Sequence, residues 1–272
     1  MMDPTVRQPA VAGTFYPGTA AGLNRQVREF ISEKPEPHRL LACIAPHAGY
    51  VYSGGVAGAL YGHLDVPRDV VILGPNHTGI GAPVAVAPHA RWSTPSGDRK
   101  VGVELAAALV ERYRAATFDA DAHRGEHSIE VQLPFLSVRQ PKLEFVPVCL
   151  GHMVLEECLE LGRVLAEIIR DHPSDVGLVA SSDMTHYRPD YEARKLDRKA
   201  IDAALELDPA SLYETVHREG ISMCGVVPAT VALAAANELG AVAAHLVAYA
   251  TSGDINNDRS AVVGYAGICI HR

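Results

Sequence analysis

Short runs of apolar, β-branched residues alternate along the chain with longer segments whose apolar positions recur at helical spacing. The apolar runs predict strands at 40–47, 69–76, 143–151, 176–183, 244–254 and 261–270. The helical segments lie at 21–33, 52–64, 102–114, 128–140, 153–172, 188–208 and 226–239, and Gly240 follows the last of them in a C-cap position. This alternation is typical of an α/β protein.

Several of the predicted strands are apolar throughout, without a regular alternation of apolar and polar positions. Such strands suit a parallel sheet that is covered by helices on both faces. We therefore predict a single domain over residues 1–272, with a mostly parallel central sheet flanked by helices. The segment 78–101, with its Gly and Pro residues, interrupts the pattern, and we expect it to form an excursion with one or two antiparallel strands.

The composition narrows the class of ligand. The formal net charge is −8, and no run of Lys or Arg is present. The chain therefore lacks the electrostatic footprint of a nucleic-acid or anionic-membrane binder, and we expect a small-molecule or peptide ligand. Without a membrane-spanning apolar stretch or a signal-like first segment, we expect a cytoplasmic protein. The five cysteines are scattered, which argues against a disulfide framework.

Polar residues with possible chemical roles follow the predicted strands. His47, His77 and Asp254 each stand at a strand exit, and Asp183 and His186 follow another. Because ligands of open α/β sheets bind outside the carboxyl ends of the strands, parallel neighbours would bring the three histidines to one rim. A strand-end histidine is also commonly a hydrogen-bonded structural residue, and Asp183 can equally cap a turn. The pattern alone leaves both interpretations open.

Two other segments can reach the same rim. His127 immediately precedes a predicted helix, for which Ser128 is a suitable N-cap. Cys224 stands just before the helix predicted at 226–239. The N–H groups and the positive dipole end of that helix are expected to lower the pKa of Cys224 and to favour a metal-binding thiolate. Ordinary apolar packing is the alternative role for this cysteine.

Motifs of other common enzyme classes do not appear. The stretch "YSGGVAG" after the first predicted strand lacks the G-x-G-x-x-G pattern of dinucleotide binding, and no Walker A motif is present. The chain also has no G-x-S-x-G elbow of a serine hydrolase.

Seven segments, in order along the chain, resemble the Memo family. They are "AGTFYPG", "APHAGYVYSG", "LGPNHTG", "GEHSIEVQLPFL", "SSDMTHY", "CGVVPATVAL" and "YATSGD", which together span nearly the whole chain. The resemblance implies a fold similar to the class III extradiol non-haem iron dioxygenases. It also implies a functional association with AMMECR-type and radical SAM proteins, the AmmeMemoRadiSam grouping of prokaryotes.

The same resemblance assigns site residues. It implies that His47, His77 and Cys224 are metal ligands, that His186 takes the acid/base role, and that Asp183 and His127 line the pocket. Two imidazoles and one thiolate form a softer donor set than two imidazoles and a carboxylate, so such a site accepts iron, copper or zinc. We expect Fe(II) or Cu as the metal, with Zn as the alternative.

Three functions are compatible with these residues. The first is a metal-dependent redox enzyme, similar to an oxygenase, that acts on a small substrate. The second is a non-catalytic module that binds a peptide or another ligand in the same pocket. The third is a zinc-type hydrolase in which His186 or Asp183 acts as the base. The sequence does not name a substrate or decide whether the protein is catalytic.

Overall fold

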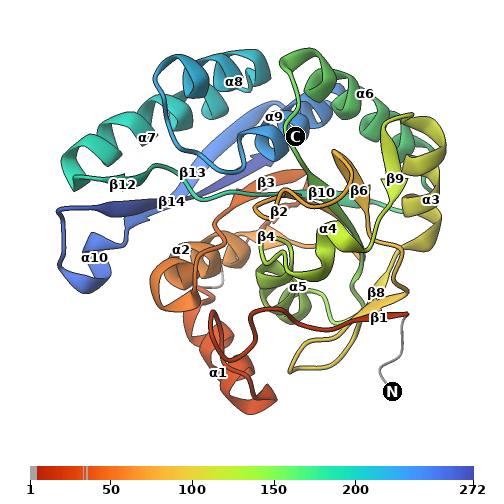
Figure 1. The fold of residues 1–272 in the computed structure, drawn as a ribbon, viewed down its shortest axis with the longest axis horizontal. Helices are drawn as coiled ribbons and strands as arrows, with labels where there is room; N and C mark the ends of the chain where they lie inside the picture. The colour runs from red at the N-terminus through yellow and green to blue at the C-terminus, as the bar shows by residue number, and fades with distance from the viewer. Residues whose placement is uncertain (1–4, 33, 35) are drawn as a thin grey trace.

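The computed structural model describes residues 5–32, 34 and 36–272 and is built around one large sheet (Figure 1). Within these residues the sheet has twelve strands in the order β1-β7-β8-β10-β5-β11-β3-β14-β12, with β13 paired to β14, and with β6 paired to β10 and β9. The strands are β1 (Val6–Arg7), β3 (Ala42–Ala45), β5 (Asp69–Pro75), β6 (Val84–Val86), β7 (Arg91–Trp92), β8 (Arg99–Val101), β9 (Ala116–Phe118), β10 (Glu144–Leu150), β11 (Val176–Ser181), β12 (His186–Arg188), β13 (Ala243–Thr251) and β14 (Val262–His271); β2 (His38–Arg39) and β4 (Leu64–Asp65) pair separately.

The central part of the sheet is parallel. Strands β10, β5, β11 and β3 are parallel neighbours, whereas β14 joins β3 in antiparallel orientation and forms a hairpin with β13. This confirms the predicted α/β class with a mostly parallel sheet. The predicted excursion contains β6, which is antiparallel to β10, and the antiparallel pair β7 and β8.

Helices cover both faces of the sheet, in two groups (Figure 1). One group is α1 (Ala20–Phe30), α2 (Tyr50–Gly62) and α5 (Leu133–Arg139), and the other is α3 (Val103–Arg112), α6 (Leu155–Asp171), α7 (Asp190–Leu205), α8 (Pro209–Arg218) and α9 (Val226–Glu238); α4 (Asp121–Arg124), the 3-10 turn η1 (Glu130–Gln132) and α10 (Gly253–Asn256) are short. No described helix is both long and apolar enough to cross a membrane. Helix α8 was absent from the sequence prediction.

The apolar strands fill two separate cores. In β5, Ile72 packs into the core under α1, α2 and α5, while Val71 and Leu73 pack into the core under α3, α6 and α9. Successive side chains of a strand point to opposite faces, so a strand covered on both faces needs apolar residues at every position. This explains why the predicted strands lack an apolar/polar alternation.

The strand register determines where the strand-end residues lie. Ser181 at the end of β11 pairs with Ala45 at the end of β3, and Ala180 pairs with Leu73 of β5. Because these three strands are parallel and in step, the segments that follow them leave the sheet at the same edge.

Candidate metal centre

Three side chains with metal-binding atoms meet at this carboxyl edge. His47 and His77 come from the segments after β3 and β5, and Cys224 directly precedes Gly225, the N-cap of α9. One ligand atom from each of the three lies within 4.8 Å of the others. The ring centroids of His47 and His77 are 5.1 Å apart, and Cys224 Sγ lies 3.2 Å from His47 Nε2. The structure thus brings together the three residues that the resemblance assigned as ligands.

The environment of His47 determines its tautomer. The Ser181 hydroxyl donates its one proton to the carbonyl of Ser128 over 2.6 Å, and His47 Nδ1 lies 2.9 Å from the same oxygen. Nδ1 must therefore carry a proton and donate it, which leaves the Nε2 lone pair free. Burial, together with His77 and His127, holds the pKa of His47 well below its usual value. His47 is thus neutral at physiological pH, with an unprotonated Nε2 that faces Cys224 Sγ.

His77 is held in the same tautomer by a carboxylate. Its Nδ1 lies 2.9 Å from Glu126 Oε1, and its backbone N–H donates to Oε2 over 2.7 Å. Burial alone raises the pKa of Glu126, but the hydrogen bond from His77 and its charge, with backbone bonds, bring that pKa down to about 2. Burial also acts to lower the pKa of His77, yet the bond to Glu126 leaves it raised. The ionised Glu126 accepts the proton on Nδ1, so Nε2 is the nitrogen without a proton when the ring is neutral.

Sequence reasoning missed Glu126. In the chain it stands between Gly125 and His127, shortly before a helix, where an acidic residue usually faces solvent. In the structure its side chain is only 1% exposed. The one available signal was its position next to His127, which was itself a candidate site residue.

Asp183 contacts two of the candidate ligands, and His186 is close enough for its charge to act on His47 and Asp183. Asp183 Oδ1 accepts the backbone N–H of His47 over 2.8 Å, and Oδ2 is 4.0 Å from His47 Nε2. Burial raises the pKa of Asp183 to about 6. The hydrogen bonds from the backbone N–H groups of His47 and Ala48, and the charge of His186, act to lower it. His186 Nδ1 bonds to the carbonyl of Ser222 over 2.9 Å. Asp183 can therefore exchange a proton near neutral pH.

His127 completes the rim. Its ring stacks on His77 at 4.8 Å between centroids and lies 5.5 Å from His47. On its other side Phe15 makes an edge contact at 4.8 Å. The N-terminal segment therefore forms one wall of the site.

The structure contradicts the expected low pKa of Cys224. Burial, and then the charge of Asp183, raise the pKa of this thiol. The first N–H of the helix, at Gly225, donates instead to the Ser182 hydroxyl over 2.9 Å. The helix end therefore does not offset the burial, and a bound cation would stabilise the thiolate.

One other expectation was also wrong. Ser128 is not the N-cap of a helix, because its hydroxyl bonds to the carbonyl of Pro75 and the first helical turn starts at Glu130. Asp254 follows β13, the strand that pairs with β14, and its carboxylate pairs with Arg194 and Arg259.

The residues at the rim fit a bound transition metal. Both imidazoles have Nδ1 engaged, which leaves Nε2 as the nitrogen that could bind a metal, as in most metal-binding histidines. In this structure His47 Nε2 lies against Cys224 Sγ. With Cys224 they form an N₂S donor set that suits Zn, Fe or Cu. His77, Glu126 and His127 form a second close group, but hydrogen bonds from His77, His127 and Ser128 already occupy the Glu126 carboxylate. The His47, His77 and Cys224 group is therefore the better candidate.

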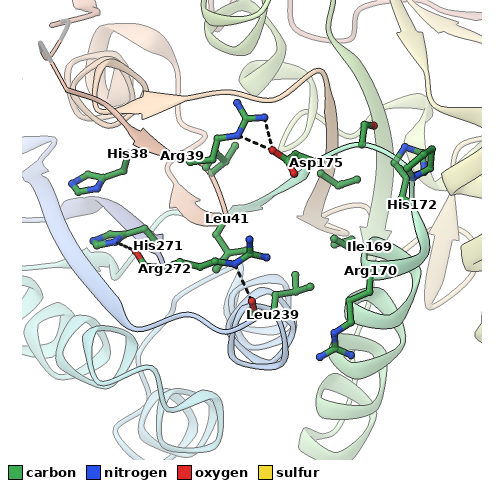
Figure 2. A pocket seen from close by; sticks show the side chains of 14 residues that line it. His38, Arg39, Leu41, Ile169, Arg170, His172, Asp175, Leu239, His271 and Arg272 are labelled. Atoms are coloured by element: carbon green, nitrogen blue, oxygen red, sulfur yellow. Dashed lines mark hydrogen bonds and ion pairs between the residues drawn. The ribbon is translucent and has the colours of Figure 1, made fainter.

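A cavity of about 360 Å³ lies at the opposite edge of the sheet, at the starts of β3 and β11 (Figure 2). It contains three arginines, but each has a structural partner. Arg39 pairs with Asp65 and Asp175, and Arg170 and Arg272 bond to carbonyls at the C-terminal end of α9. Cations at that position offset the negative end of the helix dipole. We therefore assign the cavity no ligand.

Comparisons with known proteins give a consistent result. The model of a family described as "Memo-like protein" matches residues 7–269. A MEMO1 family protein of Archaeoglobus fulgidus is 44% identical over 97% of this chain and 98% of its own length. A MEMO1 family protein of Methanopyrus kandleri is 41% identical over 98% of this chain and 99% of its own length. The fold is similar to the crystal structure of an uncharacterized Escherichia coli K12 protein, with a TM-score of 0.58 and 15% sequence identity. The superposition covers 85% of this chain and 100% of the other. The structural likeness shows the fold, and the sequence matches show that the chain belongs to the Memo family.

Proposed function

We propose that the protein is a metal-dependent redox protein, similar to an oxygenase, which binds Fe or Cu through His47, His77 and Cys224 and acts on a small organic substrate. The observation that carries the proposal is the arrangement of donor atoms. Two imidazoles with fixed tautomers keep Nε2 free, and a thiol sulfur lies within 4.8 Å of their ligand atoms. A purely structural rim would not require both rings to be held in this one tautomer.

The bound metal would supply a centre that changes oxidation state and accepts electron pairs from substrate oxygens. The protein residues supply the proton chemistry. Asp183 Oδ2 faces His47, and the pKa of about 6 lets Asp183 take or give a proton near neutral pH. His186, with Nδ1 bonded to Ser222, keeps Nε2 available for a second proton transfer when its ring is neutral.

The first prediction concerns metal content. Protein purified without oxygen is expected to hold close to one Fe or Cu per chain, and His47→Ala, His77→Ala and Cys224→Ala are each expected to lose most of it. Each variant removes one of the three proposed protein donors. Elemental analysis gives the content, and a redox titration shows whether the bound metal changes oxidation state.

Matched controls are available within the chain. Cys158 is buried in α6, and His152 is exposed in the loop before α6, and neither residue is in the candidate metal group. Cys158→Ala and His152→Ala should keep the metal. A wild type that stays empty when offered Fe(II), Cu(I) and Zn(II) would exclude a metalloenzyme, whereas Zn that is bound without any redox response would favour a hydrolase.

A further inference from the structure

Glu126 is the most heavily bonded carboxylate beside the metal centre. Its Oε1 accepts the ring Nδ1–H of His77 and the backbone N–H groups of His127 and Ser128, each at 2.9 Å. Its Oε2 accepts the backbone N–H of His77 at 2.7 Å. A single side chain thus fixes both the ring and the backbone of one candidate ligand, and the backbone of the stacked His127.

We propose that Glu126 is a positioning residue of the metal centre, which orients the His77 ring and strengthens its Nε2 as a metal donor. This inference rests on the proposed function, because it concerns the same metal. A carboxylate on the far nitrogen of a metal-binding imidazole fixes the tautomer and raises the basicity of the ligand. His47 has only a neutral hydroxyl, that of Ser181, in the corresponding place. The two histidines are therefore unequal donors, and His77 is the stronger.

The segment that carries Glu126 is itself held firmly. Arg7 donates to the backbone carbonyls of His123 and Glu126, on either side of the turn. From the sheet, Gly74 approaches so closely that a Cβ there would lie 2.5 Å from Ser128 Oγ. Burial also keeps water from competing for the carboxylate, since Glu126 is 1% exposed. The carboxylate can therefore hold the His77 ring against a fixed support.

The test is to replace Glu126 by Gln and to measure the affinity for Co(II) as a spectroscopic probe metal. An amide keeps the size of the side chain, but it has one acceptor oxygen and no charge. We expect the Kd for Co(II) to rise by roughly 10- to 100-fold in Glu126→Gln. We also expect the ligand-field bands of Co(II) to shift, because His77 donates less strongly.

Glu130→Gln is the matched control. Glu130 is also fully buried and lies four residues further along, but it bonds to Arg7, Tyr16 and the N-terminal backbone, and no bond from it to an imidazole is found among the described residues. It should lower the stability of the fold while it leaves the Kd and the bands for Co(II) close to wild type. A merely structural Glu126 would instead make the two variants behave alike.

A double-mutant cycle keeps the test decisive if Glu126→Gln is unstable. In a His77→Ala background, Glu126→Gln should cost no further Co(II) affinity, because the ring through which it acts is gone. An equal loss with and without His77 would overturn the proposal, and so would an unchanged Kd in the single variant. If the wild type binds no Co(II), Fe(II) or Cu(I), the proposed function and this inference both fail. If the wild type binds metal and Glu126→Gln has the same Kd as the wild type, this inference fails and the proposed function stands.

Discussion

Individual residues at the rim owe their positions to close backbone packing. Gly225 shows this most directly, because a Cβ at this position would lie 2.3 Å from the Ser181 carbonyl oxygen and 2.5 Å from Ser182 Cβ. The start of α9 therefore lies directly against the end of β11. Cys224 is carried by the residue before this contact, so its distance from His47 depends on the absence of a side chain at Gly225.

We expect Gly225→Ala to push the start of α9 away from β11, at a cost of roughly 1–3 kcal/mol in the free energy of unfolding. Metal affinity should fall with it, because Cys224 moves away from His47. Urea denaturation and a metal titration measure the two effects. Gly55→Ala, on the open side of α2, is the control, and it should be neutral or up to about 1 kcal/mol stabilising. Equal behaviour of the two variants would contradict the packing argument.

At the scale of the elements, a buried ion pair joins the N-terminal segment to the segment 121–132. Arg7 Nη1 lies 2.5 Å from Glu130 Oε2, with the two side chains 3% and 0% exposed. The Arg7 guanidinium also lies 4.1 Å from the ring centroid of Trp92. The same two elements carry Phe15, His127 and Glu126. The ion pair joins these elements, and neither of its side chains is in the candidate ligand group.

Replacing Arg7 by Met should lower the free energy of unfolding by roughly 3–5 kcal/mol, because it leaves Glu130 buried without its cation. Denaturation followed by the fluorescence of the single tryptophan, Trp92, measures this, and its emission should change even in the folded state. Arg25→Met is the control. Its pair with Glu29 is exposed, so its loss should cost under about 1 kcal/mol.

The helices and strands also show how much of the fold could be predicted from the sequence. The six long strands and most helices were predictable, because their hydrophobic pattern is set by the two cores. Helix α8 was missed although Asp208 caps it and Pro209 starts it, since both signals follow so closely on α7 that they read as its end. The position of β14 between β3 and β13 could not be predicted, because strand order depends on long-range pairing that leaves no local pattern.

The candidate site was also only partly predictable from the sequence. The convergence of His47 and His77 followed from strand ends and parallel pairing. The role of Glu126 and the raised pKa of Cys224 did not follow, because both depend on burial and on partners far along the chain.

At the scale of the whole molecule, buried histidine limits stability in acid. His123 is fully buried, its Nε2 bonds to the Ala85 carbonyl at 3.0 Å, and burial lowers its pKa to about 4. The unfolded chain has the ordinary value near 6.5, so it binds more protons than the folded chain between these values. Stability is therefore complete above pH 6.5 and is lost as the pH falls towards 4.

We expect this one group to remove about 3 kcal/mol from the free energy of unfolding between pH 6.5 and pH 4. The hydrogen bond from Arg194 lowers the pKa of Asp190 to about 2. Asp190 therefore adds a separate loss of stability below about pH 4, where the unfolded chain takes up a proton on this carboxylate before the folded chain does. Denaturation curves at a series of pH values separate the two windows. His123→Gln should remove about 3 kcal/mol of the loss in the upper window and leave the lower window unchanged. The rest of the upper window belongs to other buried histidines with a lowered pKa, such as His47. An unchanged upper window would refute the assignment.

The chain order of the three candidate ligands has a consequence for biosynthesis. His47 and His77 leave the ribosome early, with strands β3 and β5, whereas Cys224 appears only after β10 and β11 have been made. A metal ion that met the growing chain would find two imidazoles without the sulfur that completes the set. If the protein binds metal as proposed, stable capture would belong to the late stage of synthesis, when α9 docks on β11, and loading would be coupled to the completion of folding.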